Sequence, residues 1–248
     1  MAIEFERIRA EPAYRKVAAA LMERILDRTL RHGDRLPSET ELARQFGVNR
    51  STVREAVREL QSGGLLGRRR GSKLLVVTRP EADLVAEGVG RALVMHDVTY
   101  HDVWTALTIL EPPIAEAASL RRTAQDIDHI DGAAGQFATD NADTARAATH
   151  AAEFFRVVGA ATQNRILMMG HEPVLQLLEP SLRAMLDKVP QARSRITAAQ
   201  RRICDAIRSR DAEAARTWMT KHVRDFRKGY ELAGIGMDLR LADQASAG

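Results

Sequence analysis

Cysteine is almost absent from this sequence of 248 residues, because Cys204 is the only one. A single cysteine excludes an internal disulfide and a four-cysteine zinc site. Aromatic residues make up only 4% of the chain, whereas alanine and leucine are frequent, and this composition favours packed helices over a β-sandwich. The sequence also lacks an apolar run of 18 residues, the length that a transmembrane helix needs. Its charged N-terminus has no apolar centre typical of a signal peptide, so we expect a cytoplasmic protein.

The net charge of +4 is unevenly distributed along the chain. Residues 1–80 contain 17 lysines and arginines and 10 acidic residues, a net charge of +7. Residues 81–248 contain the other 20 basic residues and 23 acidic residues, a net charge of −3. Such asymmetry is typical of a nucleic-acid-binding module joined to another domain, although solvated surfaces can differ in charge by chance.

A helix-turn-helix is predicted over residues 36–60, after a first amphipathic helix over residues 13–30. Ser38 caps the first helix of the motif, and Glu41 three residues later completes a capping box. Gly47 supplies the left-handed residue that ends this helix and turns the chain.

The second helix of the motif has two contrasting faces. Its apolar residues recur at i, i+3, i+4 and i+7 from Val53, and its arginines fall on the opposite side. Thr52 and Glu55 are expected to form another cap at its start. Two short apolar runs then flank Arg70-Gly71-Ser72, which predicts a β-hairpin wing with a basic tip suited to a minor groove.

These residues resemble the winged-helix domain of the GntR family of bacterial transcription regulators. The pattern is Gly33-x-x-Leu36-Pro37-Ser38-Glu39-x-x-Leu42-Ala43-x-x-x-Gly47-Val48-x-Arg50-x-Thr52-Val53-Arg54-Glu55-Ala56, followed by Leu60, Gly64-Leu65 and Arg70-Gly71. The resemblance implies that Arg50, Arg54 and the pair Ser51-Thr52 contact an operator, and that Arg70 and Gly71 form the wing tip. Thr40 departs from the pattern, because family members often have a base-reading arginine there.

Arginine is suited to DNA contacts because it forks onto guanine O6 and N7 and also neutralises phosphate. Residues at the start of a recognition helix, and its N-terminal amides, reach base edges and phosphate oxygens. The candidate DNA-binding residues are Ser38, Thr40, Asn49, Arg50, Ser51, Thr52, Arg54, Arg58, Arg70 and Gly71.

Beyond a linker at Thr78-Arg79-Pro80-Glu81, the periodicity is helical throughout, with no strand alternation and no glycine-rich phosphate loop. Helices are expected over residues 82–95, 99–121, 123–138, 142–161, 164–188, 194–209 and 211–231. Pro112-Pro113 and Pro173 are expected to kink or split the helices that contain them.

The expected fold is therefore mostly α, with an N-terminal winged helix-turn-helix, a small β-hairpin wing and a C-terminal antiparallel all-α helical bundle. Residues 10–78 are expected to form the DNA-binding domain, and residues 79–98 the linker and first bundle helix. Residues 99–232 are expected to form the main helical domain, to which the resemblance described next assigns effector binding and dimerisation, and residues 233–248 a flexible tail.

The helical half resembles the FCD domain, the effector-binding domain of the FadR-type subfamily. The resemblance is carried by Leu110-Glu111-Pro112 with Ala115 and Ala117-Ala118, by Phe154 ten residues before Asn164, and by Ile203-x-x-Ala206-Ile207-x-x-x-Asp211-x-x-x-Ala215-x-x-x-Met219-x-x-His222. It implies a pocket for a small organic effector inside the bundle. The candidate pocket residues are Phe155, Asn164, Gln200 and His222.

Many relatives bind a divalent metal through an Asp-x-x-x-His pair and two further histidines. The matching positions here are Ala151, Phe155, Gln200 and His222, of which only His222 keeps its ligand type, so we expect neither a metal nor another cofactor. His222 could equally be a packed core residue. A carboxylate effector would need a different cation from the family's, with Arg156 and Arg165 as candidates.

Other residues have structural explanations that compete with a role in binding. His171 is expected to cap the kink at Pro173, and Trp104 and Trp218 could line a cavity or pack between helices. The basic run from residue 193 to 210 is expected to be a solvated face.

The sequence thus predicts a dimeric, sequence-specific DNA-binding transcription regulator, expected to be a repressor, that binds double-stranded operator DNA and a small-molecule effector. One alternative is an effector-independent architectural DNA-binding protein with a degenerate pocket. An enzyme with a DNA-binding appendage is the other alternative, and it is disfavoured because no paired carboxylates or Ser-His arrangement converge within the helical half.

Overall fold

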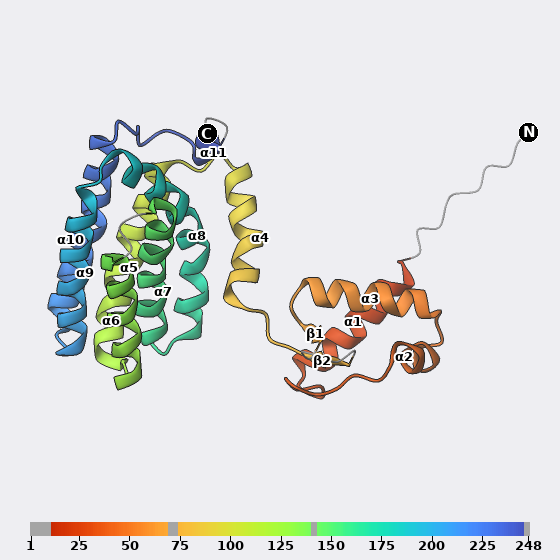
Figure 1. Cartoon of the computed structure of the whole chain (residues 1–248). Coiled ribbons are helices and arrows are strands. Elements are labelled where there is room, and N and C mark those ends of the chain that lie inside the picture. Colours follow the sequence, from red (N-terminus) through yellow and green to blue (C-terminus); the bar gives the residue numbers. More distant parts are fainter. Residues whose placement is uncertain (1–10, 69–73, 140–142, 246–248) are drawn as a thin grey trace, which may run out of the picture. The chain divides into compact units, whose positions relative to one another are not determined.

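The computed structural model describes residues 11–68, 74–139 and 143–245 (Figure 1). The chain divides into two compact units, of which the first ends at Val85 and the second begins at Ala86. The first unit combines helices with a two-stranded sheet, and the second is helical, so the predicted mostly α fold class is confirmed. Within the described ranges, no helix has the length and hydropathy needed to span a membrane.

The first unit is built around the apolar face of one helix. Its elements are α1 (Ala13–Leu26), α2 (Glu39–Phe46), α3 (Arg50–Ser62), β1 (Leu66–Arg68) and β2 (Leu75–Val77). The two strands are antiparallel, with Leu66 opposite Val77. Val53, Val57 and Leu60 of α3 are at most 1% exposed and lie in the core shared by the helices and the hairpin. This core holds α3 in place and leaves its other face to solvent.

Helix α1 ends at Leu26, earlier than the predicted end at Leu30. The Asp27 carboxylate accepts a hydrogen bond of 2.8 Å from the Thr29 backbone N–H, and Arg28 adopts a left-handed conformation with φ of 64°. An aspartate that bonds to nearby backbone groups offers an alternative to continued helix. The prediction was wrong because it followed the apolar periodicity and ignored this competing bond.

Helix α3 begins earlier than a cap at Thr52 would require. Asn49 has an extended backbone, and its carbonyl oxygen accepts a hydrogen bond of 3.3 Å from the Val53 N–H. Thr52 is therefore already inside the helix. The predicted capping pair of Thr52 and Glu55 was wrong, because the helix starts at Arg50.

The second unit is a bundle of long helices. Helix α4 (Ala82–Met95) crosses the division between the units. The bundle elements that follow it are α5 (Tyr100–Arg121), α6 (Ala124–Thr139), α7 (Thr144–Ala161), α8 (Arg165–Lys188), α9 (Ala192–Arg208), α10 (Ala212–Leu232) and α11 (Leu241–Ala245). Helix α5 contacts α7, α8, α9 and α10, so its residues form much of the bundle core (Figure 1).

The prolines do not split their helices. Helix α5 continues through Pro112 and Pro113, and α8 continues through Pro173 and Pro180. A proline inside a helix costs about 3 kcal/mol because it removes a hydrogen bond and crowds the preceding turn. Side chains on both sides of these prolines are buried in the core, and their packing favours one continuous helix. Of the two expected outcomes, splitting was therefore wrong, and a kink at these prolines stays a prediction.

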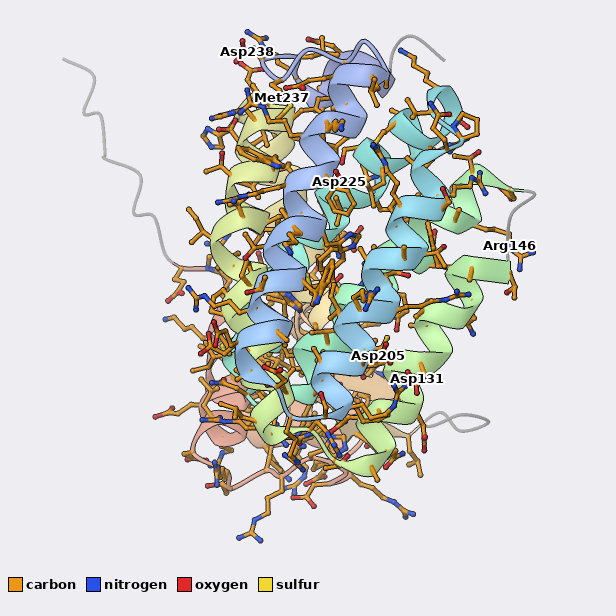
Figure 2. All side chains as sticks on the ribbon, turned by 90° about the vertical axis from the view of Figure 1, so that its left-hand side faces the viewer. Asp131, Arg146, Asp205, Asp225, Met237 and Asp238 are labelled. Atoms are coloured by element: carbon orange, nitrogen blue, oxygen red, sulfur yellow. The ribbon has the colours of Figure 1, made fainter. Side chains whose placement is uncertain are left out.

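The described residues after Ala233, which end at Ala245, pack on the bundle, contrary to the flexible tail expected over residues 233–248. Ile235 is 3% exposed, and the Tyr100 and His101 backbone N–H groups donate to the carbonyls of Leu239 and Met237, at 3.1 and 2.8 Å. These donors belong to the first turn of α5, where a helix leaves its N–H groups unpaired. Figure 2 shows Met237 at one end of the bundle, far from Asp131 and Asp205. The tail therefore completes this end of the bundle.

Candidate functional site

The turn between α2 and α3 is set by two local features. The Ser38 side chain accepts a hydrogen bond of 3.2 Å from the Glu41 N–H and so starts α2. Gly47 has φ of 65° and ends α2, after which the Val48 N–H donates to the Ala43 carbonyl at 3.1 Å. Glycine adopts such a conformation without the steric cost that other residues would meet. These features produce the helix-turn-helix that the sequence predicts.

Helix α3 has a buried apolar face and an exposed basic face. Val53, Ala56, Val57 and Leu60 are buried. Most of the candidate DNA-binding residues near it are exposed, namely Ser38, Thr40, Asn49, Arg50, Ser51, Arg54 and Arg58, while Thr52 is partly buried. The geometry thus brings hydroxyls, an amide and guanidinium groups together around the start of α3. Such groups can hold phosphate oxygens and read base edges.

Arg50 is tied to the neighbouring helix by a contact that the sequence did not indicate. Its Nε lies 3.4 Å from Glu39 Oε2, and the Arg50 side chain remains 67% exposed. The pairing joins the starts of α2 and α3, and it leaves most of the guanidinium open to solvent. Among the described residues, Arg54 and Arg58 form no ion pair, so their guanidinium groups are free to meet phosphates or bases. The predicted wing tip, Arg70 and Gly71, lies outside the described residues.

In the bundle, two of the candidate pocket residues stack on each other. The rings of Phe155 and His222 are parallel within 6°, with centroids 5.5 Å apart, and Phe226 packs edge-on against His222. His222 is 2% exposed, and its Nε2 has no hydrogen-bond partner in the described part of the protein. Burial lowers the pKa of His222 to about 3, because the interior disfavours the charged imidazolium. The imidazole is therefore neutral at physiological pH.

Gln200 and Asn164 serve different roles. Gln200 is fully buried, and neither atom of its amide has a protein partner among the described residues. An unpaired buried polar group costs about 1–3 kcal/mol, so such a side chain marks a place where a polar ligand group would be stabilised. Asn164 instead caps α8, because its side-chain oxygen accepts from the Ile166 and Leu167 N–H groups at 3.0 and 3.4 Å.

The positions that hold metal in many relatives do not fit a metal here. Ala151 and Phe155 offer no donor atom, and the phenyl ring of Phe155 covers one face of the His222 imidazole. Gln200 could offer only an amide oxygen, a poor substitute for imidazole toward a transition metal. One histidine cannot replace a set of three or four ligands.

His171 is a buried hydrogen-bonding residue, and the predicted cap at Pro173 was wrong. Its Nδ1 lies 3.1 Å from Glu111 Oε1, and both side chains are at most 1% exposed. Arg156, one of the cations considered for a carboxylate effector, instead binds Glu172 with its Nε at 2.9 Å. These contacts join α5 and α7 to α8. The sequence could not reveal them, because the two members of each pair lie on different helices.

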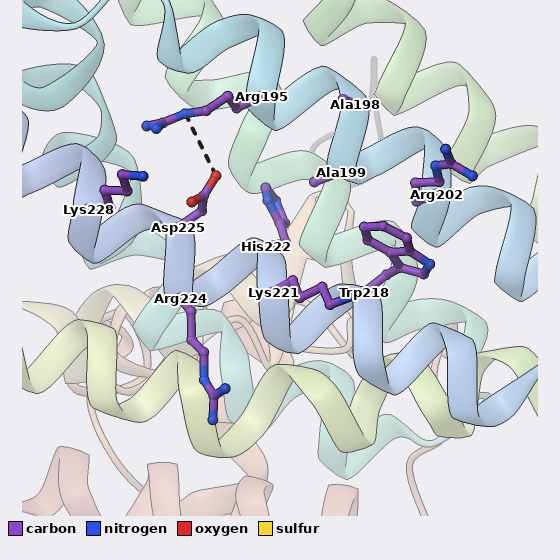
Figure 3. A pocket seen from close by; sticks show the side chains of 10 residues that line it. All are labelled: Arg195, Ala198, Ala199, Arg202, Trp218, Lys221, His222, Arg224, Asp225 and Lys228. Carbon is purple, nitrogen blue, oxygen red and sulfur yellow. Dashed lines mark ion pairs between the residues drawn. The ribbon is translucent and has the colours of Figure 1, made fainter.

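A groove of about 570 Å³ opens between α9 and α10 (Figure 3). Its residues are Arg195, Ala198, Ala199, Arg202, Trp218, Lys221, His222, Arg224, Asp225 and Lys228. The sequence predicted a solvated basic face over α9, but two of these arginines border a concave surface. The groove reaches His222, so it connects the solvent with the aromatic cluster.

The buried His222 should make the free energy of unfolding decrease as the pH is lowered. Its lowered pKa means that the unfolded chain binds a proton below about pH 6.5 while the folded chain does not, so stability falls with decreasing pH. The loss should approach about 1.4 kcal/mol per pH unit between the two pKa values. Urea unfolding of the wild type and His222→Phe from pH 7 to 4.5 measures it, and the variant should lose stability less steeply. Equal slopes would contradict a neutral, buried imidazole.

Comparison with known proteins assigns both units. The description "Bacterial regulatory proteins, gntR family" matches residues 13–76, and the FCD domain matches residues 102–225. An Escherichia coli (strain K12) protein, whose name assigns it to regulation of the L-lactate dehydrogenase operon, is 30% identical over 216 residues, covering 84% of this chain and 82% of its own length. The HTH-type transcriptional repressor NanR of Cronobacter sakazakii is 28% identical over 221 residues, covering 86% and 85%.

A solved structure supports the same conclusion. The Streptococcus agalactiae GntR protein superposes with a TM-score of 0.62 and 26% identity, covering 87% of this chain and 99% of its own. The family and the relatives named here are transcription regulators and not enzymes. The match to the GntR family includes the arginine-bearing helix α3, and the match to the FCD domain covers most of the bundle. The chain therefore belongs to the GntR family of bacterial transcription regulators.

Proposed function

We propose that the protein is a cytoplasmic, homodimeric repressor that binds double-stranded operator DNA through α3 and responds to a small organic effector bound by its helical bundle without a metal. One observation carries the DNA-binding part: α3 buries its apolar face completely and exposes Arg50, Arg54 and Arg58. A helix held in this way is a rigid reader, because the side chains that reach DNA do not also support the fold.

A dimer is supported by the limited reach of one winged helix. A single module contacts a few base pairs, whereas two modules on a two-fold axis read a palindrome. The chain also exposes large apolar side chains on the bundle and on α4, including Met95 at 85%, Ile109 at 66% and Ile166 at 82%. Their burial against a second copy would contribute to association.

Repression and its release are supported by the two-unit organisation. NanR, a relative over most of the chain, is named as a repressor. An effector that prefers one of two arrangements of the DNA-binding units shifts their population, and so changes the operator affinity of the dimer. The bundle offers buried polar atoms, at Gln200 and His222, to which such an effector could bind.

Selection of bound fragments from random double-stranded DNA tests the DNA-binding proposal. The full-length protein should enrich an inverted repeat, and its affinity for that repeat should exceed that for a scrambled sequence by about 10³-fold or more. Sedimentation should find two chains per duplex. Equal affinity for repeat and scrambled DNA would show that the protein does not recognise sequence.

The alternative is a dimeric architectural DNA-binding protein without an effector. It is favoured by the stacking of Phe155 on His222, because aromatic rings then occupy part of the bundle interior. The two functions differ in one measurable respect. A small organic acid that raises the melting temperature and also releases the selected DNA would establish the regulator, whereas ligand binding without release would leave the DNA-binding function independent of it.

A further inference from the structure

The cations of the α9–α10 groove are arranged as two pairs. Arg195 and Arg202 are seven residues apart on α9, and Lys221 and Lys228 are seven residues apart on α10. Seven residues are close to two helical turns, so each pair lies on one helix face with about 10 Å between its members. An ion pair joins Arg195 to Asp225 at 3.7 Å, so the 195 end of α9 faces the 228 end of α10. The groove therefore has two basic ends.

Figure 3 shows how the side chains lie at these ends. Arg195 and Lys228 point toward the same region as Asp225, while Arg202 and Lys221 lie at the opposite end around Trp218. The Lys221 Nζ lies 4.4 Å from the centre of the Trp218 ring, and the Arg202 guanidinium carbon 5.4 Å. Arg224 points away from the groove. An aromatic ring that holds two cations keeps both ordered at one end.

The floor between the ends is apolar except for one group. Ala198 and Ala199 line it, and the buried His222 projects into it between the two helices (Figure 3). The His222 Nε2 has no partner among the described residues, although a buried ring nitrogen normally has one. A solvated basic face would require neither a concave apolar floor nor an unpaired buried nitrogen. These features together indicate a binding site.

Charge selects the ligand. Of the five basic residues at the groove, Arg224 points away, so four cations face a single carboxylate, Asp225, which lies at the Arg195 end. A short apolar body would fit over the alanines, and each anionic end would meet one arginine and one lysine, either Arg195 with Lys228 or Arg202 with Lys221. We propose that the groove binds an elongated organic anion with a carboxylate or phosphate group at each end and an apolar middle. This inference rests on the proposed function in that it names the class of effector, but binding to the groove can be measured without DNA.

The test uses probes of equal length that differ only in their ends. Suberate carries two carboxylates on an eight-carbon chain, octanoate carries one, and 1,8-octanediol carries none. Isothermal titration calorimetry of the full-length protein should give suberate at least about tenfold higher affinity than octanoate, with no binding of the diol. The affinity should fall as salt rises, because exposed charges are screened. Equal affinity for suberate and octanoate would overturn the proposal.

A phosphonate probe identifies the preferred anionic group. The compound 7-phosphonoheptanoate replaces one carboxylate of suberate with a phosphonate and keeps its six methylene groups. Tighter binding than suberate would assign one end to a phosphate-bearing ligand, and weaker binding would assign both ends to carboxylates. Either result supports a ligand that is anionic at both ends, whereas failure of both compounds to bind would overturn it.

Substitutions locate the site. The double variant Arg202→Gln/Lys221→Gln removes one basic end and should weaken suberate binding at least about tenfold. The matched control Arg208→Gln/Arg216→Gln also removes one charge from α9 and one from α10, but at residues paired with Asp131 and Glu116 outside the groove. It should change the affinity less than twofold. Equal weakening in both variants would show that only the overall charge matters.

A variant with the opposite effect excludes misfolding as the cause. Asp225→Asn removes the only carboxylate of the groove and should tighten suberate binding severalfold. The chain has two tryptophans, so a Trp104→Phe background leaves Trp218 as the only indole reporter at the basic end. Suberate should change its fluorescence in that background, and an unchanged signal at saturating suberate would place the ligand elsewhere. Operator binding is measured separately, so loss of suberate binding with intact DNA binding would refute this site alone.

Discussion

Replacing Arg54 with alanine should abolish sequence-specific DNA binding and leave the fold intact. The side chain is exposed on α3 and forms no ion pair among the described residues, so its removal costs the folded state little. A bidentate arginine–guanine contact is worth about 1–3 kcal/mol. The proposed dimer would lose two such contacts at once, about 2–6 kcal/mol, which would lower affinity by about 30-fold to 10⁴-fold. Fluorescence anisotropy with the selected duplex measures this change.

The companion substitution Arg50→Ala should have a similar effect on binding, although Arg50 also pairs with Glu39. Because that pair is exposed, its loss should change stability by less than about 1 kcal/mol. Arg24→Ala on α1 removes the same charge from another exposed helix of the unit and serves as the control. Unchanged operator affinity in the Arg54 variant would refute the assignment of α3 as the recognition helix.

Arg58 allows phosphate contacts to be separated from base contacts. It is exposed two turns after Arg50 and Ser51, further from the start of the helix. If it contacts phosphate, Arg58→Ala should weaken specific and scrambled DNA equally and reduce the salt slope by about 1. Arg54→Ala should instead reduce the difference between the two sequences. Comparing the two variants on specific and scrambled DNA therefore tests which arginine contacts phosphate and which contacts a base. It also tests whether this face of α3 binds DNA.

Replacing His171 with alanine should destabilise the bundle more than any surface substitution. Glu111 is fully buried, and its Oε1 depends on the His171 ring, while its Oε2 has no partner in the described part of the chain. Removing one member of a buried pair typically costs about 3–5 kcal/mol, because the other is left without compensation. Urea unfolding followed by circular dichroism measures the free energy of unfolding.

The pH dependence of this variant has a defined sign. Burial raises the pKa of the Glu111 carboxyl, and the hydrogen bond from His171 opposes that shift. Without His171 the raised pKa persists, so the folded chain holds a proton that the unfolded chain has released. Stability contributed by this carboxyl is therefore present at low pH and lost as pH rises, and His171→Ala should be relatively more stable at pH 5 than at pH 8.

A double variant provides the control for this pair. Glu111→Gln/His171→Ala removes the buried charge together with its partner, and should be less destabilised than the sum of the two single variants. Strict additivity would indicate that the two side chains do not stabilise each other. The DNA-binding unit should keep its helices in all three variants, because it has its own core.

The features that could be predicted from the sequence are those set by local chemistry. The Ser38 cap, the left-handed Gly47 and the spacing of Val53 from Leu60 each act within a few residues, and together they specify the helix-turn-helix. Local chemistry also misled in places. A rule that prolines interrupt helices fails at Pro112, because the packing of α5 against its neighbours outweighs a lost backbone bond.

The features that could not be predicted depend on residues distant in sequence. The Glu111–His171 pair joins residues 60 positions apart, and the Arg50–Glu39 pair joins residues 11 positions apart across a turn. The basic run of α9 was visible, but its role depends on which face α10 covers and on the register between the two helices. That Trp218 and Lys221 line the groove beside the arginines of α9 could be seen only in the structure.

The closing segment of the chain has a consequence for how the bundle can be divided. Leu239 and Met237 accept hydrogen bonds from the first turn of α5, and the Leu241 N–H donates to the Val98 carbonyl at 3.0 Å. A fragment cut at Leu232, where the last long helix ends, would leave the α5 groups without their partners. It would also expose to solvent the core residues that Ile235 covers. The smallest bundle that keeps these hydrogen bonds therefore extends to Leu241. A bundle transplanted into another regulator has to include residues 233–241.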